Sequence, residues 1–363
     1  MMNILFRADA SKKIGTGHIM RCLTLANELK KQGENTIFCS RHLTAGLENI
    51  IVSLGHQLIK LIDEDRVENN NVADQYSSWL ETSQYFDADE VVAKVQLEVI
   101  DWLVVDHYAL DVQWHHKIRE NCNNIKILVI NDLFDKYHSC DLFLNQNIVG
   151  DEGRAYRTLL DANVSKLVGP KYSLLRDEFN QYRKKSSVRK NGVKNILVFL
   201  GGIDIDNVTG KVLSALAQIE NATFSVRVVI GVSHPSIDEI KIMCASCGYN
   251  LSIQVDNMAE LMAWADLSIA ASGSASWERS CLGLPSIIIA LADNQIAIAE
   301  AAENVGLIKY LGKNEEINQL SIKNAVIELC NDTDELQRMS EICFEYTDGL
   351  GKRRVVEKMR ALS

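Results

Sequence analysis

The stretch Gly15-Thr16-Gly17-His18 stands between a short apolar segment, Asn3 to Phe6, and an amphipathic segment, Ile19 to Lys31. The first segment is typical of a buried strand, and the second has apolar side chains at helical spacing. Glycines let the backbone approach a ligand closely, and the start of the helix offers free N–H groups and the positive end of its dipole. This unit predicts an anion-binding turn between a strand and a helix.

His18 adds chemistry to this turn, because it stands where the helix begins. The positive dipole end disfavours an imidazolium ion, so we expect a neutral imidazole that can accept a proton. Arg21, three residues later on the same helical face, further favours the neutral ring. The simpler alternative is a histidine that only caps the helix. The turn is not the dinucleotide fingerprint, because Met20 occupies the third glycine position, and the chain has no Walker sequence.

Length and charge narrow the function classes. The 363 residues suffice for two domains with separate cores. The formal net charge of −10 argues against broad binding of nucleic acid or an anionic membrane, although a helix N-terminus can still hold one diphosphate. We expect no secretory signal, because Arg7 and Asp9 interrupt the first apolar stretch, and no segment approaches the ~18 apolar residues of a membrane span. The nine cysteines lack framework spacing, which indicates free thiols and a cytoplasmic location.

Apolar strand segments alternate with helical segments along the chain, which predicts an α/β protein with parallel sheets. The basic segment Arg183 to Lys194 interrupts this alternation and is interpreted as a linker. We therefore expect two Rossmann-like domains facing across a cleft, over residues 1–182 and 195–345. A C-terminal helix, 346–363, is expected to pack back on the first domain. The acidic stretch Asp63 to Asp74 is expected to form a long loop.

Two turns of small residues follow predicted strands in the second domain, Gly201-Gly202 and Ser272 to Glu278. Backbone N–H groups at Ser274 and Ala275 can meet an oxyanion, and the Glu278 carboxylate can accept hydrogen bonds from a ribose diol. A capping box by itself would also explain Glu278. It would not explain why a second glycine turn ends another strand of the same domain.

Other polar residues at strand ends are weaker candidates. Asp204-x-Asp206 could form part of a metal site, but Asp206 as a helix N-cap is the simpler interpretation. We expect uracil near the strand-end segment Asp256–Met258, at the same edge of the sheet. Asn294 and Gln295 follow a strand, where contact with a ligand and capping of a helix are about equally plausible.

In the first domain, Asp106-His107-Tyr108 and Asn131-Asp132 follow two successive predicted strands. Carboxyl ends of parallel strands are where α/β sites form. These side chains could be simple turn residues. Two polar clusters at adjacent strand ends nevertheless predict a pocket wall.

Taken together, these residues resemble the UDP-2,4-diacetamido-2,4,6-trideoxy-β-L-altropyranose hydrolases of pseudaminic acid biosynthesis. The resemblance spans nearly the whole chain and departs from the usual pattern at Asn131, where an acidic residue is usual, and at Asp177. The matching segments are Arg7-Ala8-Asp9-Ala10-Ser11, Ile14-Gly15-Thr16-Gly17-His18, Arg21-Cys22-Leu23, Asp106, Tyr108, Asn145-Gln146-Asn147, Gly169 to Arg176, Gly201-Gly202 and Ser272 to Glu278.

This resemblance implies a GT-B fold and a hydrolysis that needs no metal and no cofactor. Water would attack the anomeric carbon of a UDP-linked diacetamido trideoxy sugar, in a pathway that leads to flagellin glycosylation. The resemblance implies His18 as the catalytic residue and a UDP site in the second domain. The expected sugar-binding residues are Gly17, Arg21, Asp106, Tyr108, Asn145, Lys171 and Tyr172. The expected UDP-binding residues are Gly201, Gly202, Asn257, Met258, Ser274, Ala275, Glu278, Asn294 and Gln295.

Other functions fit part of the same pattern. An inverting GT-B glycosyltransferase that uses a UDP-sugar would need an acceptor groove, and often an apolar or basic membrane-facing patch, which the first domain does not show. A nucleotide-sugar epimerase is a further alternative. A non-catalytic nucleotide-sugar-binding protein would keep Gly201, Gly202 and Glu278 but would not need His18. The sequence leaves the exact sugar and the oligomeric state open.

Overall fold

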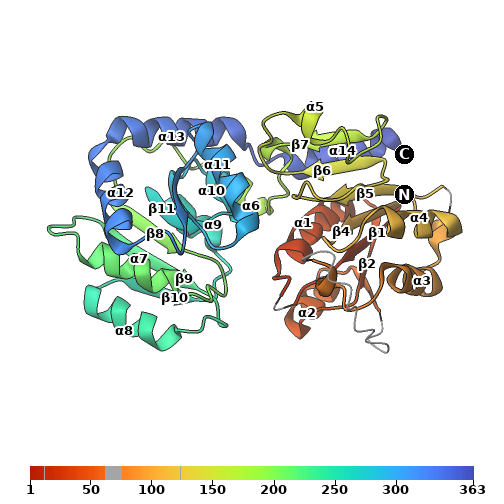
Figure 1. Ribbon diagram of the computed structural model, residues 1–363, viewed down its shortest axis with the longest axis horizontal. Coiled ribbons are helices and arrows are strands. Elements are labelled where there is room, and N and C mark those ends of the chain that lie inside the picture. The colour runs from red at the N-terminus through yellow and green to blue at the C-terminus, as the bar shows by residue number, and fades with distance from the viewer. Residues whose placement is uncertain (12, 62–75, 123) are drawn as a thin grey trace. The chain divides into compact units, whose positions relative to one another are not determined.

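The structure is a computed structural model that describes residues 1–11, 13–61, 76–122 and 124–363 (Figure 1). The expected loop at Asp63 to Asp74 lies outside the described residues. The chain forms two compact units. Unit 1 comprises Met1–Leu175 and Leu350–Ser363, and unit 2 comprises Arg176–Gly349. Among the described helices, none combines the length and apolar character that a membrane span requires.

Unit 1 contains a seven-stranded parallel sheet in the order β3-β2-β1-β4-β5-β6-β7. The topology reverses between β1 and β4, where open α/β sheets form their sites. The strands are β1 (Asn3–Ala8), β2 (Asn35–Ser40), β3 (Gln57–Lys60), β4 (Trp102–Asp106), β5 (Lys126–Ile130), β6 (Leu142–Asn145) and β7 (Ser165–Val168). The described helices are α1 (Gly17–Lys31), α2 (Ala45–Ser53), α3 (Gln84–Lys94), α4 (Val112–Asn121), α5 (Glu152–Ala155) and α14 (Gly351–Leu362), with short 3-10 turns η1 (Ser77–Trp79), η2 (Leu97–Val99) and η3 (Pro170–Tyr172).

Alternate side chains of β1 enter two separate cores, as the period of a strand requires. Ile4 and Phe6 pack in a cluster that includes Met359 of α14, together with apolar residues of α1. Leu5 packs in a second cluster that includes Trp114 of α4 and residues of α3. Because both faces are covered, successive residues Ile4, Leu5 and Phe6 of the strand are all apolar.

Unit 2 contains a six-stranded parallel sheet in the order β10-β9-β8-β11-β12-β13. Its central strands bury isoleucine, leucine and valine against the flanking helices. The strands are β8 (Asn195–Phe199), β9 (Ser225–Ile230), β10 (Asn250–Ile253), β11 (Leu267–Ala271), β12 (Ser286–Ala290) and β13 (Lys309–Lys313). The helices are α6 (Asp177–Arg183), α7 (Val208–Ala217), α8 (Ile237–Cys247), α9 (Met258–Trp264), α10 (Ala275–Cys281), α11 (Ile296–Asn304), α12 (Gln319–Asn331) and α13 (Thr333–Tyr346), with a 3-10 turn η4 (Asp293–Gln295).

The boundary between the units lies at Arg176, earlier than the basic segment 183–194 that we interpreted as a linker. That segment is built into unit 2 by its arginines, which donate to carbonyl groups near helix ends that would otherwise lack partners. Arg183 donates to the carbonyls of Cys281, Phe344 and Thr347. The buried Arg189 donates to the carbonyls of Ala263, Ala265 and Leu282.

The C-terminal stretch is two helices, and only the last belongs to unit 1. Helix α13 ends at Tyr346 in unit 2, and α14 begins at Gly351 and packs against α1 and η3. A Cβ atom on Gly351 would lie 2.3 Å from the carbonyl oxygen of Ser173 and 2.4 Å from the carbonyl carbon of Tyr172. Both are backbone atoms, so only glycine allows the helix to approach this closely.

We expect Gly351→Ala to destabilise unit 1 by about 1–3 kcal/mol, the usual cost of overpacking a well-packed contact. The measurement is thermal unfolding followed by calorimetry. Gly46→Ala is the matched control, because a Cβ at this helical position meets no atom within 4 Å. The control is expected to be neutral or slightly stabilising. Equal melting temperatures for the two variants would contradict the close approach at Gly351.

Candidate active site

The turn between β1 and α1 is tight and built from its own backbone. The Gly15 N–H donates to the Ser11 carbonyl at 2.8 Å, and Gly15 has a φ of +78°, which favours glycine. Helix α1 starts at Gly17, and the Thr16 side chain makes no capping hydrogen bond. A Cβ on Gly17 would meet no atom within 4 Å. The local sequence therefore produces the open helix start that the glycine turn predicts.

His18 does more than cap the helix, because its ring is paired with Asp106 at the end of β4. The His18 Nδ1 atom lies 2.6 Å from Asp106 Oδ1. Arg21, one turn further along α1, donates from Nε to Asp106 Oδ2 and from Nη2 to Asp106 Oδ1, both at 2.6 Å. The Asp106 side chain is 0% exposed. A two-pronged guanidinium contact of this kind is among the strongest that a buried carboxylate can receive.

The charge on Asp106 determines which nitrogen of His18 carries the proton. Burial by itself raises the pKa of Asp106, but the Arg21 guanidinium and then His18 outweigh burial and hold this pKa well below its ordinary value. An ionised carboxylate only accepts hydrogen bonds, so Nδ1 of His18 must donate. In the neutral ring, Nε2 then keeps its lone pair. The arrangement can accept a proton at Nε2 and stabilise the resulting imidazolium.

Arg21 also joins this pair to Asp132, which follows β5. Arg21 Nη1 donates to Asp132 Oδ2 at 2.5 Å, and the Tyr108 hydroxyl donates to the same oxygen at 2.7 Å. Asn147 Nδ2 donates to Asp132 Oδ1 at 3.1 Å. Burial and the neighbouring Asp132 raise the pKa of Tyr108 well above its ordinary value, so Tyr108 stays a phenol. Sequence reasoning placed Asp132 in a pocket wall and Asn147 in a matching segment, but it predicted neither contact of Asp132, with Arg21 or with Asn147.

Aromatic rings border His18. The ring of Tyr108 meets His18 edge-on at 4.7 Å between centroids, and Trp79 meets it edge-on at 6.0 Å. Trp79 also stacks on Tyr108 with an interplanar angle of 26°. Sequence reasoning missed Trp79, because η1 has no helical or strand periodicity that would signal its position.

Two residues expected to bind the sugar are buried and make hydrogen bonds within the fold. Asp106 is buried with both oxygens paired, as described above. Asn145 is also 0% exposed: its Nδ2 donates to the Tyr156 hydroxyl at 2.9 Å, and its Oδ1 accepts from the Asn147 N–H at 2.8 Å. Both side chains therefore support the site through contacts within the fold, and a direct contact of either with the sugar stays a prediction.

Lys171 and Tyr172 lie in η3, which packs against α14. Lys171 is exposed, and its carbonyl accepts from Arg354 Nη1 at 2.8 Å. Tyr172 is partly buried against the core of unit 1. No contact recorded for the described residues joins these two side chains to His18, so their role toward a sugar stays a prediction.

Asn131, where the sequence departs from the hydrolase pattern, forms a separate buried pair with His138. Asn131 Nδ2 lies 3.0 Å from His138 Nε2, and Asn131 Oδ1 accepts from the Leu133 N–H at 2.6 Å. Burial lowers the pKa of His138 to about 4, which suits a neutral ring that accepts this hydrogen bond. Asn131 therefore shapes the turn after β5, and the carboxylate that reaches Arg21 comes from Asp132.

In unit 2, the glycine turn after β8 approaches the turn after β9. A Cβ on Gly231 would lie 2.0 Å from the Gly202 carbonyl oxygen, so the two loops touch through their backbones. Gly201 has a φ of +100°, and Asp204 also has a positive φ, of +44°. The interpretation of Asp206 as the N-cap of α7 is wrong, because Asn207 occupies that position and accepts from the Gly210 N–H at 3.0 Å.

Asp204 supports the same helix start. Its carboxylate accepts from the Val208 N–H at 3.0 Å and from the N–H and hydroxyl of Thr209 at 2.7 and 2.6 Å. His234 Nε2 lies 3.4 Å away. Among the described residues, no group of three or more His, Cys, Asp or Glu could hold a metal ion. Asp204 is a capping residue here, as local hydrogen bonding requires.

Glu278 lies in the first turn of α10 but does not close a capping box, and the Ser274 side chain makes no capping hydrogen bond. The Glu278 Oε1 atom is 3.5 Å from Arg176 Nη2, which also contacts Glu178 at 3.0 Å. Burial raises the pKa of Glu278, and Arg176 opposes this. Because the contact with Arg176 is long, the carboxylate keeps capacity to accept hydrogen bonds from a ligand.

The remaining candidates of unit 2 share one edge of its sheet. Each follows the carboxyl end of a parallel strand: Gly201 and Gly202 after β8, Asn257 and Met258 after β10, Ser274 and Ala275 after β11, and Asn294 and Gln295 after β12. Asn257 and Asn294 are exposed, and Met258 is buried. Gln295 Oε1 accepts from the Leu291 N–H at 3.0 Å, so this side chain already has one partner in the fold.

Comparison with known proteins supports this architecture. Residues 195–351 match the glycosyltransferase family 28 C-terminal domain. An uncharacterized protein of Methanocaldococcus jannaschii is 28% identical over 295 residues, which cover 79% of this chain and 55% of that protein. The chain thus spans about half the length of that relative. The UDP-2,4-diacetamido-2,4,6-trideoxy-beta-L-altropyranose hydrolase of Campylobacter jejuni is 27% identical over 72% of this chain and 81% of its own. The spore coat polysaccharide biosynthesis protein SpsG of Bacillus subtilis is 23% identical over 86% and 85%.

Solved structures establish the fold. MurG of Acinetobacter baumannii has a TM-score of 0.68 at 15% identity, covering 99% of this chain and 100% of that one. A UDP-glucosyltransferase of Polygonum tinctorium has a TM-score of 0.69 at 12% identity, covering 99% and 98%. At such low identity the likeness concerns the fold alone. The chain has the GT-B fold, which confirms the fold expected from the sequence.

We expect Asp106→Asn to destabilise unit 1 by about 3–5 kcal/mol at neutral pH, the usual cost of breaking a buried ion pair. The measurement is denaturant unfolding at several pH values. The pKa of Asp106 is lower in the folded than in the unfolded chain, so its stabilisation is complete above the unfolded value of about 4 and is lost as pH falls through the folded value. The difference between wild type and variant should therefore shrink below about pH 4. A difference independent of pH would contradict an ionised Asp106.

Proposed function

We propose that this protein hydrolyses UDP-2,4-diacetamido-2,4,6-trideoxy-β-L-altropyranose to UDP and the free sugar. The observation that carries this proposal is the His18–Asp106 pair, which leaves His18 Nε2 able to accept a proton. The GT-B fold and the match to a glycosyltransferase family 28 domain support an enzyme that acts on a nucleotide sugar. The likeness to the Campylobacter jejuni hydrolase supports the choice of sugar.

In the proposed reaction, His18 Nε2 takes a proton from water while the water oxygen bonds to the anomeric carbon. The bond from that carbon to the β-phosphate oxygen breaks, and its electron pair leaves with UDP. Asp106 stabilises the imidazolium that forms. A positioned base of this kind contributes about 10²–10⁴ in rate. UDP is a good leaving group, so the reaction does not need the second carboxylic acid that glycosidases use.

The proposal assigns the nucleotide to unit 2. Glu278 would accept hydrogen bonds from the ribose hydroxyls. Backbone N–H groups near Gly201-Gly202 and Ser274-Ala275 would hold the diphosphate and stabilise the charge that grows on it as the bond breaks. The uracil would lie beside Asn257 and Met258, with Asn294 and Gln295 at the same edge of the sheet. Gly17, Arg21 and Tyr108 would face the sugar in unit 1.

An inverting glycosyltransferase is the second candidate, because the matched domain is that of a glycosyltransferase family. The same base would then take the proton of an acceptor hydroxyl instead of water. Incubation with the UDP-linked diacetamido sugar alone separates the two, with UDP and free sugar measured over time. Release of both without an acceptor supports the hydrolase. No release supports a transferase or a non-catalytic binding protein.

We expect His18→Asn to lower kcat by about 10²–10⁴ and to leave UDP affinity nearly unchanged, because asparagine keeps a polar contact at the Nδ1 position but lacks the base. Steady-state kinetics and calorimetry measure the two effects. His116→Asn, an exposed histidine in α4, is the matched control. Reaction in ¹⁸O water should place the label on the anomeric oxygen of the sugar. Near-normal turnover by His18→Asn, or label on the phosphate, would contradict this mechanism.

We expect Glu278→Ala to weaken UDP binding by roughly 1.5–3 kcal/mol, about 10- to 150-fold in Kd, which is the range for hydrogen bonds to a charged group. Titration calorimetry with UDP is the measurement. Glu341→Ala, an exposed position in α13, controls for the loss of one negative charge from unit 2. Unchanged affinity in Glu278→Ala would remove Glu278 from the nucleotide site.

A further inference from the structure

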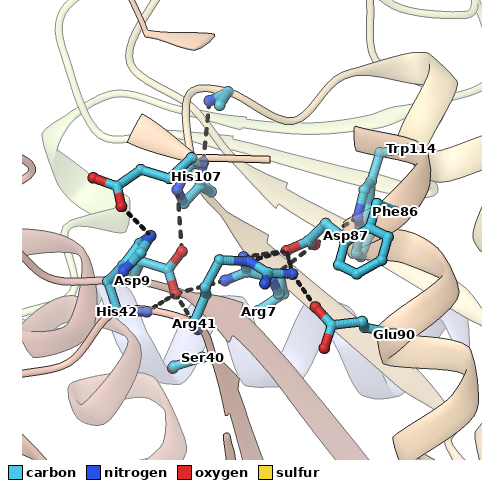
Figure 2. Close-up of polar contacts among 12 residues, drawn as sticks. Arg7, Asp9, Ser40, Arg41, His42, Phe86, Asp87, Glu90, His107 and Trp114 are labelled. Carbon is cyan, nitrogen blue, oxygen red and sulfur yellow. Dashed lines mark hydrogen bonds and ion pairs between the residues drawn. The ribbon is translucent and has the colours of Figure 1, made fainter. Parts of the chain in front are cut away.

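A second ionised cluster lies beside the candidate site, at the carboxyl ends of β1, β2 and β4 (Figure 2). The Arg7 side chain is 0% exposed. It donates from Nε and Nη2 to the two oxygens of Asp87 at 3.0 and 2.7 Å, and from Nη1 to Asp9 Oδ1 at 2.7 Å. Arg41 and the Trp114 indole also donate to Asp87, the indole at 2.9 Å. The proposed reaction uses none of these residues.

Asp9 connects this cluster to the chain around it. Its Oδ1 accepts from the backbone N–H groups of Arg41 at 2.7 Å and His42 at 3.3 Å, in the turn after β2. Burial by itself raises the pKa of Asp9, but Arg7 outweighs it and lowers this pKa far below its ordinary value. Asp9 is therefore ionised. Its second oxygen, Oδ2, lies 3.3 Å from Nε2 of His107, within ion-pair distance, and neither of these two buried atoms makes a hydrogen bond in the described part of the chain.

The tautomer of His107 follows from its other nitrogen. The Ala109 N–H donates to His107 Nδ1 at 3.1 Å, so Nδ1 carries no proton. Burial lowers the pKa of His107 even though Asp9 opposes it, which keeps the ring neutral. The single ring proton is therefore on Nε2, which faces the Asp9 carboxylate (Figure 2).

The two histidine–aspartate pairs of unit 1 join the same two chain segments. The segment after β1 supplies the carboxylate of one pair and the imidazole of the other. Asp9 follows β1 and begins the segment that leads to His18, and its partner is His107. Asp106 ends β4 and immediately precedes His107, and its partner is His18. Strands β1 and β4 are neighbours, and Ala8 pairs with Asp106 in their register. Each segment thus supplies one carboxylate and one imidazole to the other.

We infer that Asp9 and His107 are positioning residues for His18. Their contact fixes the segment after β4 against the segment after β1, and so holds the Asp106 carboxylate at Nδ1 of His18. The inference rests on the proposed function for the role of His18 as a base. The geometric part, that the contact between Asp9 and His107 sets the contact between Asp106 and His18, does not depend on any activity.

Two substitutions of His107 separate its two nitrogens. Glutamine places an amide nitrogen near the Nε2 position and keeps a donor for Asp9, whereas asparagine reaches only the Nδ1 position and loses that donor. We expect His107→Asn to lower kcat about 10- to 100-fold with KM unchanged, by analogy with the loss of a hydrogen-bond partner that orients a metal-bound histidine. We expect His107→Gln to restore kcat close to wild type. His115→Gln, at another buried histidine of unit 1, controls for loss of a buried imidazole.

The direct readout is nitrogen NMR of the full chain labelled on its eight histidines. In the wild type, we expect the proton on Nδ1 in His18 and on Nε2 in His107. The Nδ1 proton signal of His18 should persist in His107→Gln and be lost by exchange in His107→Asn. Thermal unfolding of each variant, compared with His115→Gln, tests that it is folded.

Several results would overturn the inference. These are a wild-type His107 protonated on Nδ1, an unchanged His18 signal and kcat in folded His107→Asn, or an equal loss in the Gln and Asn variants. If His107→Asn does not fold, the inference is still tested by the tautomer of His107 in the wild type and by kcat and the His18 signal in His107→Gln. If the wild type releases no UDP, the proposed function fails while the tautomers and the His18 signal still test the positioning.

Discussion

The ionised carboxylate of Asp106 receives hydrogen bonds from one turn of α1, from His18 and from both prongs of Arg21. Removing a carboxylate from water costs several kcal/mol, so Asp106 can stay ionised at the end of β4 only because the guanidinium is fixed beside it. The same contact fixes the rotation of α1 about its axis. The carboxylate accepts a hydrogen bond from Nδ1 of His18. This hydrogen bond therefore sets the orientation of the imidazole and the position of the free lone pair on Nε2.

Arg21 extends this constraint across the sheet. Through Asp132 it reaches the turn after β5, and Asp132 in turn accepts from Tyr108 after β4 and from Asn147 after β6. Side chains from the ends of neighbouring strands are thereby held in one network. A site supported in this way loses little entropy when a substrate binds, because its groups are already oriented. The polar turn residues of the sequence are thus joined into a single rigid edge.

The sequence predicted the elements better than the roles of individual side chains. The strand–turn–helix unit at Gly15 to His18, the second-half glycine turns and the return of the last helix to unit 1 follow from apolar spacing and turn chemistry. The interpretation of 183–194 as a solvent-exposed linker was wrong. Its positive charges suggested exposure to solvent, but Arg183 and Arg189 donate hydrogen bonds to buried backbone carbonyls. The sequence also did not show that Asn145 is buried and hydrogen-bonded to Tyr156 and to the Asn147 backbone.

By itself, the sequence determined two parallel α/β units and a histidine at the open start of α1, because burial and helix initiation depend on residues a few positions apart. Only the tertiary structure decided what that histidine touches. Asp106 is 88 positions away along the chain and reaches His18 because β4 pairs beside β1 with Ala8 opposite Asp106. The proton position on His18 depends on the charge of that distant carboxylate, and the charge depends on burial and on Arg21. The spacing of residues along the chain shows neither the burial of Asp106 nor its contact with Arg21.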